Sequence, residues 1–419
     1  MILSTSPAIT IVASMVVFLT VILFLITLLL YARKKLVPQG SVTIDINEEK
    51  QVEVSSGSTL LATLATEKVF LPSACGGVGT CGMCKCQVVE GGGGILPTEE
   101  GFFTRRQIHQ DWRLGCQVKV RNDLKIVVPE EVLGIRKWEC EVVSNRNVAS
   151  FIKEFVVKLP KGETLNFKPG GYIQIDVPKY KMKFDDIEVD ERFRAEWDKF
   201  GLWDLKMKNS GETYRAYSMA NHPAEGNIVI LNIRIATPPW DRAKGTWSNH
   251  HPGKCSSYIF SRKPGDQVTV SGPYGEFFIK DTKNEMLYIG GGAGMAPLRS
   301  HLFHLFHTLK TTDRMVSYWY GARSKNEIFY EEDFRAIEKQ FPNFTFNIAL
   351  NEPLPEDNWT GYTGFIHQVI YDNYLSKHDA PEDIEYYMCG PGPMAAAVID
   401  MLDNLGVPKE MLAFDDFGN

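Results

Sequence analysis

Four cysteines stand at a spacing that suits a metal or an iron–sulfur cluster. Cys75, Cys81 and Cys84 form a C-x5-C-x2-C pattern, and Cys116 follows later in the chain. Four thiolates can hold either a tetrahedral zinc ion or a 2Fe-2S cluster. A zinc ribbon usually has two C-x2-C pairs, and this chain has one, so the spacing favours the cluster and leaves zinc as the alternative. We expect Cys86, two residues past Cys84, to be a small buried side chain on a strand.

A second set of residues could bind a diphosphate and a flat ring. Arg215-Ala216-Tyr217-Ser218 is expected on a strand, where Arg215 and Tyr217 share one face. An arginine can hold a diphosphate bidentately, and a tyrosine ring can pack against an isoalloxazine. Residues 253–256 (GKCS) are expected to open a helix, whose free N–H groups favour a phosphate.

A third set lies at the ends of two apolar strands. Residues 286–289 form an apolar run followed by GGGAGMAP at 290–297 and then a helical pattern. Glycines at such a turn let backbone amides approach a pyrophosphate at the helix N-terminus, although the pattern is not G-x-G-x-x-G. A similar turn, MCGPGPM at 388–394, places Cys389 at the carboxyl end of a strand, where ligands bind in open α/β sheets.

An uncharged stretch near the N-terminus is long enough to cross a membrane. Residues 8–31 carry no charge, and about 20 residues suffice for a span. A cleaved signal peptide is the alternative, but no basic region precedes the stretch and no small-x-small cleavage site follows it. Arg33, Lys34 and Lys35 come directly after it, which predicts that the rest of the chain faces the cytoplasm.

The remaining pattern predicts the elements that position these residues. A hairpin is expected at 41–54, a helix at 58–68, and strands at 86–89, 116–120, 138–143, 154–159, 286–289, 315–320 and 386–388. A helix is expected at 298–309, and a charged insertion with some helix at 178–212. Strands alternate with helices only after residue 285, which indicates an α/β domain there.

The composition excludes several classes of protein. The 419 residues have a net charge of -6, which argues against binding to nucleic acid. Hydrophobic residues make up 44% and charged residues 23%, as in folded globular proteins. Eight cysteines are too few for a disulfide-stapled secreted scaffold, so we expect free thiols in a reducing compartment.

The cysteine region resembles a β-grasp ferredoxin with the longer, adrenodoxin-like first spacing, and the regions with R-x-Y-S and GGGAGMAP resemble the ferredoxin-NADP reductase superfamily. The resemblance implies an α+β multidomain fold with a single N-terminal transmembrane helix, a β-grasp domain, an antiparallel β-barrel for flavin and an α/β nucleotide-binding domain with a parallel sheet. The expected domains are 1–35 (transmembrane helix), 36–130 (2Fe-2S), 131–280 (FAD, with the insertion 178–212) and 281–419 (NADH).

Together the four parts resemble the family of NADH-oxidising F subunits of sodium-translocating NADH:quinone oxidoreductases. The resemblance implies site residues of three kinds. The expected cluster ligands are Cys75, Cys81, Cys84 and Cys116. The expected FAD and NADH contacts are Arg215, Tyr217, Ser218, Ser256, Gly290, Gly291, Gly292, Ala293, Gly294 and Gly390. Cys389 is expected beside the nicotinamide ring, and Phe417, in the ending FDDFGN, is expected to cover the flavin ring.

The function that this resemblance implies is electron input to a respiratory complex. NADH would give a hydride to FAD, and electrons would pass singly through the 2Fe-2S cluster to other subunits that reduce quinone and pump sodium, because a flavin must stand between a two-electron donor and a one-electron acceptor. The implied location is a bacterial inner (plasma) membrane.

Two other functions share parts of the pattern. A reductase component of an oxygenase has the same modules, and a membrane-tethered electron carrier would not oxidise NADH at all. The residues alone do not decide between NADH and NADPH, because Arg323 and Lys325 follow the strand at 315–320 and could accept a 2'-phosphate. The family resemblance implies NADH.

Overall fold

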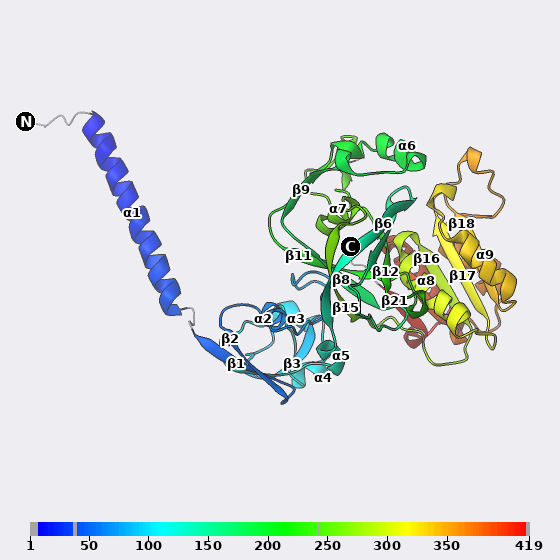
Figure 1. The fold of residues 1–419 in the computed structure, drawn as a ribbon, viewed down its shortest axis with the longest axis horizontal. Helices are drawn as coiled ribbons and strands as arrows, with labels where there is room; N and C mark the ends of the chain where they lie inside the picture. The colour runs from blue at the N-terminus through cyan, green and yellow to red at the C-terminus, as the bar shows by residue number, and fades with distance from the viewer. Residues whose placement is uncertain (1–6, 37–39, 242, 416–419) are drawn as a thin grey trace, which may run out of the picture. The chain divides into compact units, whose positions relative to one another are not determined.

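The computed structural model describes residues 7–36, 40–241 and 243–415 (Figure 1). The chain divides into two compact units. The first contains the described residues up to Pro72 and Gly77–Gly134, and the second contains Ser73–Gly76 and the described residues from Ile135 onward. The four-part division with boundaries at 35, 130 and 280 remains a prediction.

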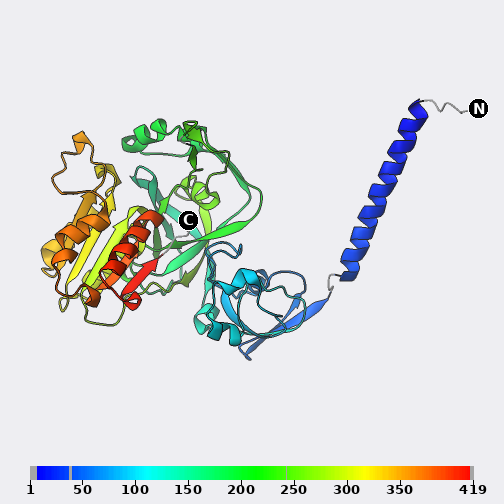
Figure 2. The ribbon, with the colours of Figure 1, turned by 180° about the vertical axis from the view of Figure 1, so that it is seen from behind.

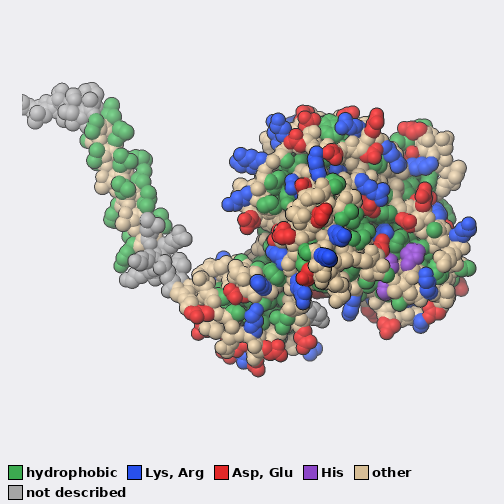
Figure 3. Space-filling view, in the orientation of Figure 1, with side chains coloured by type: hydrophobic (Ala, Val, Ile, Leu, Met, Phe, Trp, Pro, Cys, Tyr) green, Lys and Arg blue, Asp and Glu red, His purple; other side chains and the backbone are tan. Residues whose placement is uncertain are grey.

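The N-terminal helix α1 (Pro7–Leu36) has 30 residues. Within it Ile11–Leu29 is long and apolar enough to cross a membrane, with none of that stretch buried by the protein. Nineteen residues rise ~28 Å in a helix, close to the thickness of a hydrocarbon core. Figure 3 shows the described side chains of this helix as mostly hydrophobic. Helices of this length and composition occur both as membrane anchors and as signal sequences.

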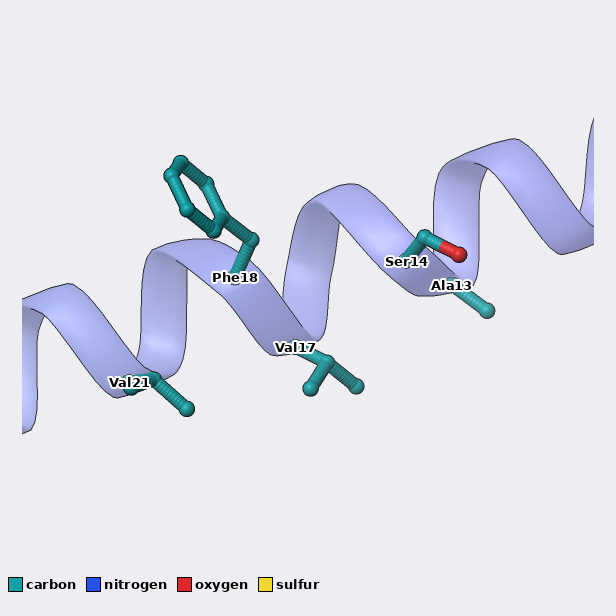
Figure 4. A pocket seen from close by; sticks show the side chains of 5 residues that line it. All are labelled: Ala13, Ser14, Val17, Phe18 and Val21. Carbon is teal, nitrogen blue, oxygen red and sulfur yellow. The ribbon is translucent and has the colours of Figure 1, made fainter.

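A shallow hollow on the surface of α1 is lined almost entirely by apolar side chains. It is lined by Ala13, Ser14, Val17, Phe18 and Val21 (Figure 4). Ser14 supplies the one polar side chain in that lining, so the hollow is a stretch of helix surface with no titratable group.

A five-stranded sheet forms the core of the first unit, in the order β2-β1-β5-β3-β4. Its strands are β1 (Ser41–Ile46), β2 (Lys50–Ser55), β3 (Lys85–Glu90), β4 (Trp112–Leu114) and β5 (Leu124–Val127). Strands β1 and β5 are parallel, and the β1–β2 hairpin is antiparallel as expected. Helix α2 (Leu60–Thr66) is N-capped by Thr59, whose hydroxyl accepts a hydrogen bond from Ala62 N at 3.2 Å. These elements make the β-grasp fold.

The predicted strand at 116–120 is wrong. Its alternation is present, since Cys116, Val118 and Val120 are buried, but its backbone pairs with the start of α2 and the residues before it. Leu60 N donates to Val118 O at 2.8 Å, and Val120 N donates to Ser58 O at 3.0 Å. The alternation of buried and exposed residues at 116–120 therefore reflects burial of one face of the segment, which makes an isolated bridge and is not part of a sheet strand.

A buried ion pair supports the region that leads to Cys116. Glu99 is fully buried and accepts hydrogen bonds from Arg113 Nη2 at 2.7 Å and from Leu114 N at 2.8 Å. Arg113 Nη1 also donates to Gly92 O at 3.0 Å and Gly93 O at 2.8 Å. This network joins helix α3 (Pro97–Glu100), the turn after β3 and strand β4.

The second unit begins with a six-stranded antiparallel sheet in the order β11-β8-β15-β6-β7-β12. Its strands are β6 (Arg136–Ala149), β7 (Ile152–Lys158), β8 (Tyr172–Val177), β11 (Thr213–Ser218), β12 (Ile228–Arg234) and β15 (Gln267–Tyr274). A bridge between Met219 and Leu231 joins the two edges into a barrel. The insertion folds as β9 (Tyr180–Lys183), α6 (Glu191–Lys199) and β10 (Lys206–Asn209), so the expectation of some helix is confirmed.

A parallel sheet completes the second unit, in the order β19-β18-β17-β16-β20-β21. Its strands are β16 (Met286–Gly291), β17 (Val316–Ala322), β18 (Phe344–Leu350), β19 (Tyr362–Thr363), β20 (Glu385–Cys389) and β21 (Leu412–Asp415). Helices α8 (Met295–Phe303) and α9 (Glu331–Gln340) pack on one face. Helices α10 (Ile366–Asn373) and α11 (Gly392–Asn404) pack on the other face, which is turned toward the viewer in Figure 2.

Candidate functional site

The two glycine turns of the parallel sheet lie against each other. Strand β16 ends at Gly291, a single 3-10 turn (Gly292–Gly294) follows, and α8 begins at Met295. The neighbouring strand β20 places Cys389 opposite Gly290. The carboxyl ends of adjacent parallel strands therefore meet at the N-terminus of α8, the position at which an anion is favoured.

The close approach of these turns requires glycine. A Cβ on Gly294 would lie 2.0 Å from Cys389 O, and a Cβ on Gly390 would lie 2.3 Å from Met394 Cε. Gly292 has φ +55°, in the left-handed region. The missing side chains of Gly290, Gly291 and Gly294 make room for neighbouring protein atoms, and these three residues are buried. Gly292, Ala293 and Gly390 are the partly exposed part of the two turns, so a pyrophosphate site over all six residues remains a prediction.

Cys389 ends strand β20, which is one strand in from the end of the sheet. Its side chain is 2% exposed, and β20 lies between β16 and β21. On the β21 side its register partner is Asp415. Asp415 Oδ2 in turn accepts a hydrogen bond from Ser218 Oγ at 2.5 Å. Ser218, the last residue of the R-x-Y-S strand, therefore joins the barrel to the parallel sheet next to Cys389.

Strand β11 presents Arg215 and Tyr217 as expected. It pairs antiparallel with β8, with Tyr217 opposite Ile173 and Arg215 opposite Ile175. Arg215 Nη1 donates to Tyr214 O at 2.7 Å, which holds the half-buried guanidinium against its own strand. Both side chains lie on one face, and Ser218 follows at the buried end of the strand.

The predicted helix after Gly253 is α7 (Lys254–Phe260). Gly253 caps it without a side-chain hydrogen bond, and a Cβ there would lie 2.6 Å from Ala236 Cβ. The first N–H groups of a helix lack partners within the helix, so this bare N-terminus fits a phosphate. Ser256 Oγ accepts a hydrogen bond from Ala236 N at 3.1 Å, which fixes the first turn.

Helix α7 and strand β11 meet through Cys255 and Tyr217. The Cys255 thiol forms a hydrogen bond with the Tyr217 hydroxyl and lies in the field of the Arg215 guanidinium. Burial raises the pKa of Cys255 to about 12, so the thiol stays protonated. These contacts bring a cation, an aromatic ring and a bare helix N-terminus together, which is the set of groups that a flavin dinucleotide needs.

In the first unit three of the predicted cysteine ligands lie together. A hydrogen bond with the Cys116 thiol, together with burial, raises the pKa of Cys84 well above its ordinary value, and Cys81 is close enough to add to the shift. Cys75 belongs to the segment Ser73–Gly76, which groups with the second unit, so its place among the ligands remains a prediction. Cys86 is fully buried on β3, as expected.

The loop around these thiols has the form of a cradle. Gly77, Gly79 and Gly82 all have positive φ, and a Cβ on Gly77 would lie 3.3 Å from Leu61 Cδ2. Gln117 Nε2 lies 3.6 Å from Cys116 Sγ and donates to it. Among the described residues, no group of three or more His, Cys, Asp or Glu is arranged to hold a metal ion. The neighbouring thiols of Cys81, Cys84 and Cys116 are therefore not preassembled as a metal site, and their role as cluster ligands remains a prediction.

Two contributors were absent from the residue-type patterns. Asp415 stands in the terminal FDDFGN sequence, where the sequence prediction concerns Phe417, and Phe417 lies outside the described residues. Cys255 sits within GKCS but carries no motif of its own. The one sequence signal for Asp415 is its place two residues before Phe417. The sequence contains no signal for Cys255.

Three family models match the chain. They are a 2Fe-2S iron-sulfur cluster binding domain at residues 43–121, an oxidoreductase FAD-binding domain at 201–279 and an oxidoreductase NAD-binding domain at 288–400. They cover the cysteine loop, the R-x-Y-S strand with α7, and both glycine turns.

Relatives match over nearly the whole length. The F subunit of the Na(+)-translocating NADH-quinone reductase of Pseudomonas aeruginosa (strain UCBPP-PA14) is 54% identical over 401 residues, 96% of this chain and 97% of that protein. The protein of the same name from Neisseria gonorrhoeae is 51% identical over 408 residues, 97% of this chain and 99% of that protein.

Solved structures share the fold. The ferredoxin reductase in carbazole 1,9a-dioxygenase has a TM-score of 0.57 at 25% identity and covers 91% of this chain and 99% of its own. An Amycolatopsis cytochrome P450 reductase has a TM-score of 0.61 at 22% identity, over 90% of this chain and 98% of its own.

Proposed function

The chain belongs to the family of F subunits of the Na(+)-translocating NADH-quinone reductase, and from that membership we propose how its residues divide the work. It is the NADH-oxidising, electron-input subunit, with 2Fe-2S, FAD and NAD modules. FAD, when bound, supplies the conversion between the two-electron hydride of NADH and single-electron transfer to a 2Fe-2S cluster.

The nucleotide substrate would be held at the carboxyl edge of the parallel sheet. Backbone amides of Gly290, Gly291, Gly292, Ala293 and Gly294 would bind the pyrophosphate, and Gly390 would face it from the neighbouring turn. Cys389 would orient the nicotinamide ring from the carboxyl end of β20, where the residue is itself buried. Phe417 would border the same space.

The flavin would be held by the barrel. Arg215 and the N-terminus of α7, with Ser256 in its first turn, would bind the diphosphate, and the Tyr217 ring would pack against the isoalloxazine. Ser218 would stand at the meeting of the two sites. The observation that carries this proposal is the bond between Ser218 and Asp415, because Asp415 is the strand neighbour of Cys389.

In the first unit Cys81, Cys84 and Cys116 would hold the cluster, with Cys75 as the fourth ligand. Cys81 and Cys84 stand on a loop whose glycines have positive φ, and such a loop could offer backbone N–H groups to a cluster whose sulfurs accept hydrogen bonds. This subunit would pass electrons to the other subunits of the reductase, which we propose as its partners.

A membrane complex accounts for α1. We propose that α1 anchors the chain in the bacterial inner membrane and that both units face the cytoplasm, because Arg33, Lys34 and Lys35 follow the apolar stretch. Protease added to sealed right-side-out vesicles should leave both units intact, and protease added to inverted vesicles should release them. Digestion in right-side-out vesicles would reverse the orientation.

The function is tested by a visible spectrum of the purified chain before and after NADH. We expect a flavin spectrum that bleaches and an iron–sulfur absorption that falls with it. Flavin that stays oxidised in excess NADH would favour the tethered electron carrier. The oxygenase-reductase alternative shares the fold, as the carbazole dioxygenase reductase does, but the full-length identity of 51–54% lies with the F subunits.

A further inference from the structure

A basic residue stands where a dinucleotide-binding sheet reads the adenosine ribose. Strand β17 is the parallel neighbour of β16, with Gly321 opposite Gly291, and Arg323 comes directly after β17 ends at Ala322. At the end of this second strand an acidic residue typically binds the ribose 2'-hydroxyl, whereas an arginine accommodates a 2'-phosphate. By residue type alone, Arg323 would suit NADPH.

The structure shows that this arginine is already engaged. Arg323 Nη2 donates to Glu327 Oε1 at 2.8 Å and lies 3.4 Å from Glu196 Oε2. The guanidinium also stands over the Phe151 ring, 5.6 Å from its centroid. Both carboxylates contact the same Nη2 atom and the side chain is 39% exposed, so the two ion pairs compete with a ligand for the guanidinium without burying it.

One of the two carboxylates comes from the charged insertion. Glu196 lies on α6, and the same helix makes a second contact with the loop, because Arg192 Nε and Nη2 both donate to Asn326 Oδ1 at 3.2 Å. Helix α6 therefore rests on the loop that follows β17. The insertion, whose sequence showed no function, adds an acidic side chain to this corner.

The two carboxylates next to Arg323 disfavour a phosphate at this one guanidinium. Two carboxylates share one guanidinium, and a 2'-phosphate would bring up to two more negative charges beside them. Other basic groups lie around these carboxylates: Lys199 Nζ is 3.4 Å from Glu196 Oε1, Arg192 binds Asn326, and Lys325 is exposed on the loop. Burial lowers the pKa of Arg234, with the charge of Arg323 adding to the shift. A ribose 2'-hydroxyl can instead donate to a carboxylate at no cost in charge.

We propose that Glu196 and Glu327 make this subunit select NADH over NADPH, by holding Arg323 away from a 2'-phosphate and by repelling that phosphate. The proposal rests on the proposed function, since it assumes that the nucleotide binds along Gly290–Gly294. It assigns the insertion a role in substrate choice, through Glu196.

The test uses the full chain in detergent and two probes, 5'-AMP and adenosine 2',5'-bisphosphate, titrated by calorimetry. The variants are Glu196→Gln, Glu327→Gln and both together, which remove charge while keeping size. We expect the double variant to bind the bisphosphate at least about 10-fold more tightly while its affinity for 5'-AMP changes by less than about threefold. The ratio of kcat/KM for NADPH to that for NADH should rise in parallel.

Two controls isolate the cause. Glu331→Gln removes a carboxylate that pairs with a different arginine, Arg335, and should change neither affinity. Arg323→Ala added to the double variant should abolish the gain, because the freed guanidinium is the group that binds the phosphate. A gain that survives without Arg323 would overturn its part in the proposal.

The outcomes separate the two levels of inference. A double variant that binds 5'-AMP normally and shows no gain for the bisphosphate overturns the selection by Glu196 and Glu327. A wild-type chain that binds neither 5'-AMP nor NADH overturns the proposed function instead. Each single variant is expected to give part of the gain, so the proposal stays testable if the double variant does not fold.

Discussion

Asp415 Oδ2 accepts a hydrogen bond from Ser218 Oγ at 2.5 Å, and this bond joins the parallel sheet to the barrel. Asp415 ends β21 and Ser218 ends β11, so two strand ends from distant parts of the chain are fixed against each other. Because Asp415 is also the register partner of Cys389, the bond sets the distance between the proposed flavin and nicotinamide sites.

Replacing Asp415 by Ala should slow hydride transfer while FAD stays bound. The carboxylate positions Ser218, and a displacement of ~1 Å at a reacting centre can cost ~100-fold in rate. We expect a loss of about 10- to 100-fold in the rate of flavin bleaching after rapid mixing with NADH. Asp415→Asn keeps an acceptor oxygen and should lose less. If Ser218→Ala and Asp415→Ala give fully additive losses, the two residues do not act through one bond.

Replacing any one of Cys75, Cys81, Cys84 and Cys116 by Ala should abolish the bound iron and acid-labile sulfide. Cys86→Ala is the matched control and should keep both, because Cys86 lies on β3 outside the loop. Flavin bleaching by NADH should persist in all of these variants, since hydride transfer precedes transfer to the cluster. A full complement of iron in Cys116→Ala would remove that residue from the ligand set.

Cys389→Ala should slow flavin bleaching, whereas Phe417→Ala should change nucleotide affinity. Cys389 lies buried at the carboxyl end of β20, so its loss should misplace the ring without emptying the proposed pyrophosphate site. If Phe417 covers the flavin ring, it has to move aside for the nicotinamide, and removing it should alter the KM for NADH. Unchanged rates and affinities in both variants would withdraw both assignments.

Stability should fall in acid because of His301. Burial lowers the pKa of this fully buried histidine to about 4, against about 6.5 in an unfolded chain. The unfolded state therefore takes up a proton first, so this stability is present above about pH 6.5 and is lost toward pH 4, by at most about 3 kcal/mol. His301→Gln should flatten the change in thermal unfolding between pH 7 and pH 5, and the exposed His251→Gln should not. Equal slopes in both variants would contradict this account.

Most helices and strands could be predicted from the sequence because their hydrophobic periodicity coincides with actual pairing or packing in the fold. The hairpin of β1 and β2 and the βα turn at 290–294 are local, and their glycines and alternation mark them directly. The strand expected at 116–120 failed because burial of Cys116 and Val118 arises from packing against α2, which a pattern cannot tell from strand pairing. Long-range pairing was the missing information.

The site residues that lie in short local motifs could be predicted, and those that act through distant partners could not. Cys389, Tyr217 and the glycines fall in short motifs with a chemical reason, whereas Asp415 and Glu196 matter only through partners that lie 197 and 127 residues away in the chain. A carboxylate has no signature until its neighbour is known. The charged insertion illustrates this, since its sequence predicted some helix and indicated no function.

The buried pair of Glu99 and Arg113 has a consequence for assembly. It ties the turn at Gly92 and Gly93 and the strand before Cys116 into one rigid frame by bonds among protein atoms alone. That frame does not depend on iron for its charge balance, unlike a zinc finger that folds only with its metal. The ferredoxin fold should therefore persist when iron and sulfide are lost, so a damaged cluster can be rebuilt in place on a chain that has not unfolded.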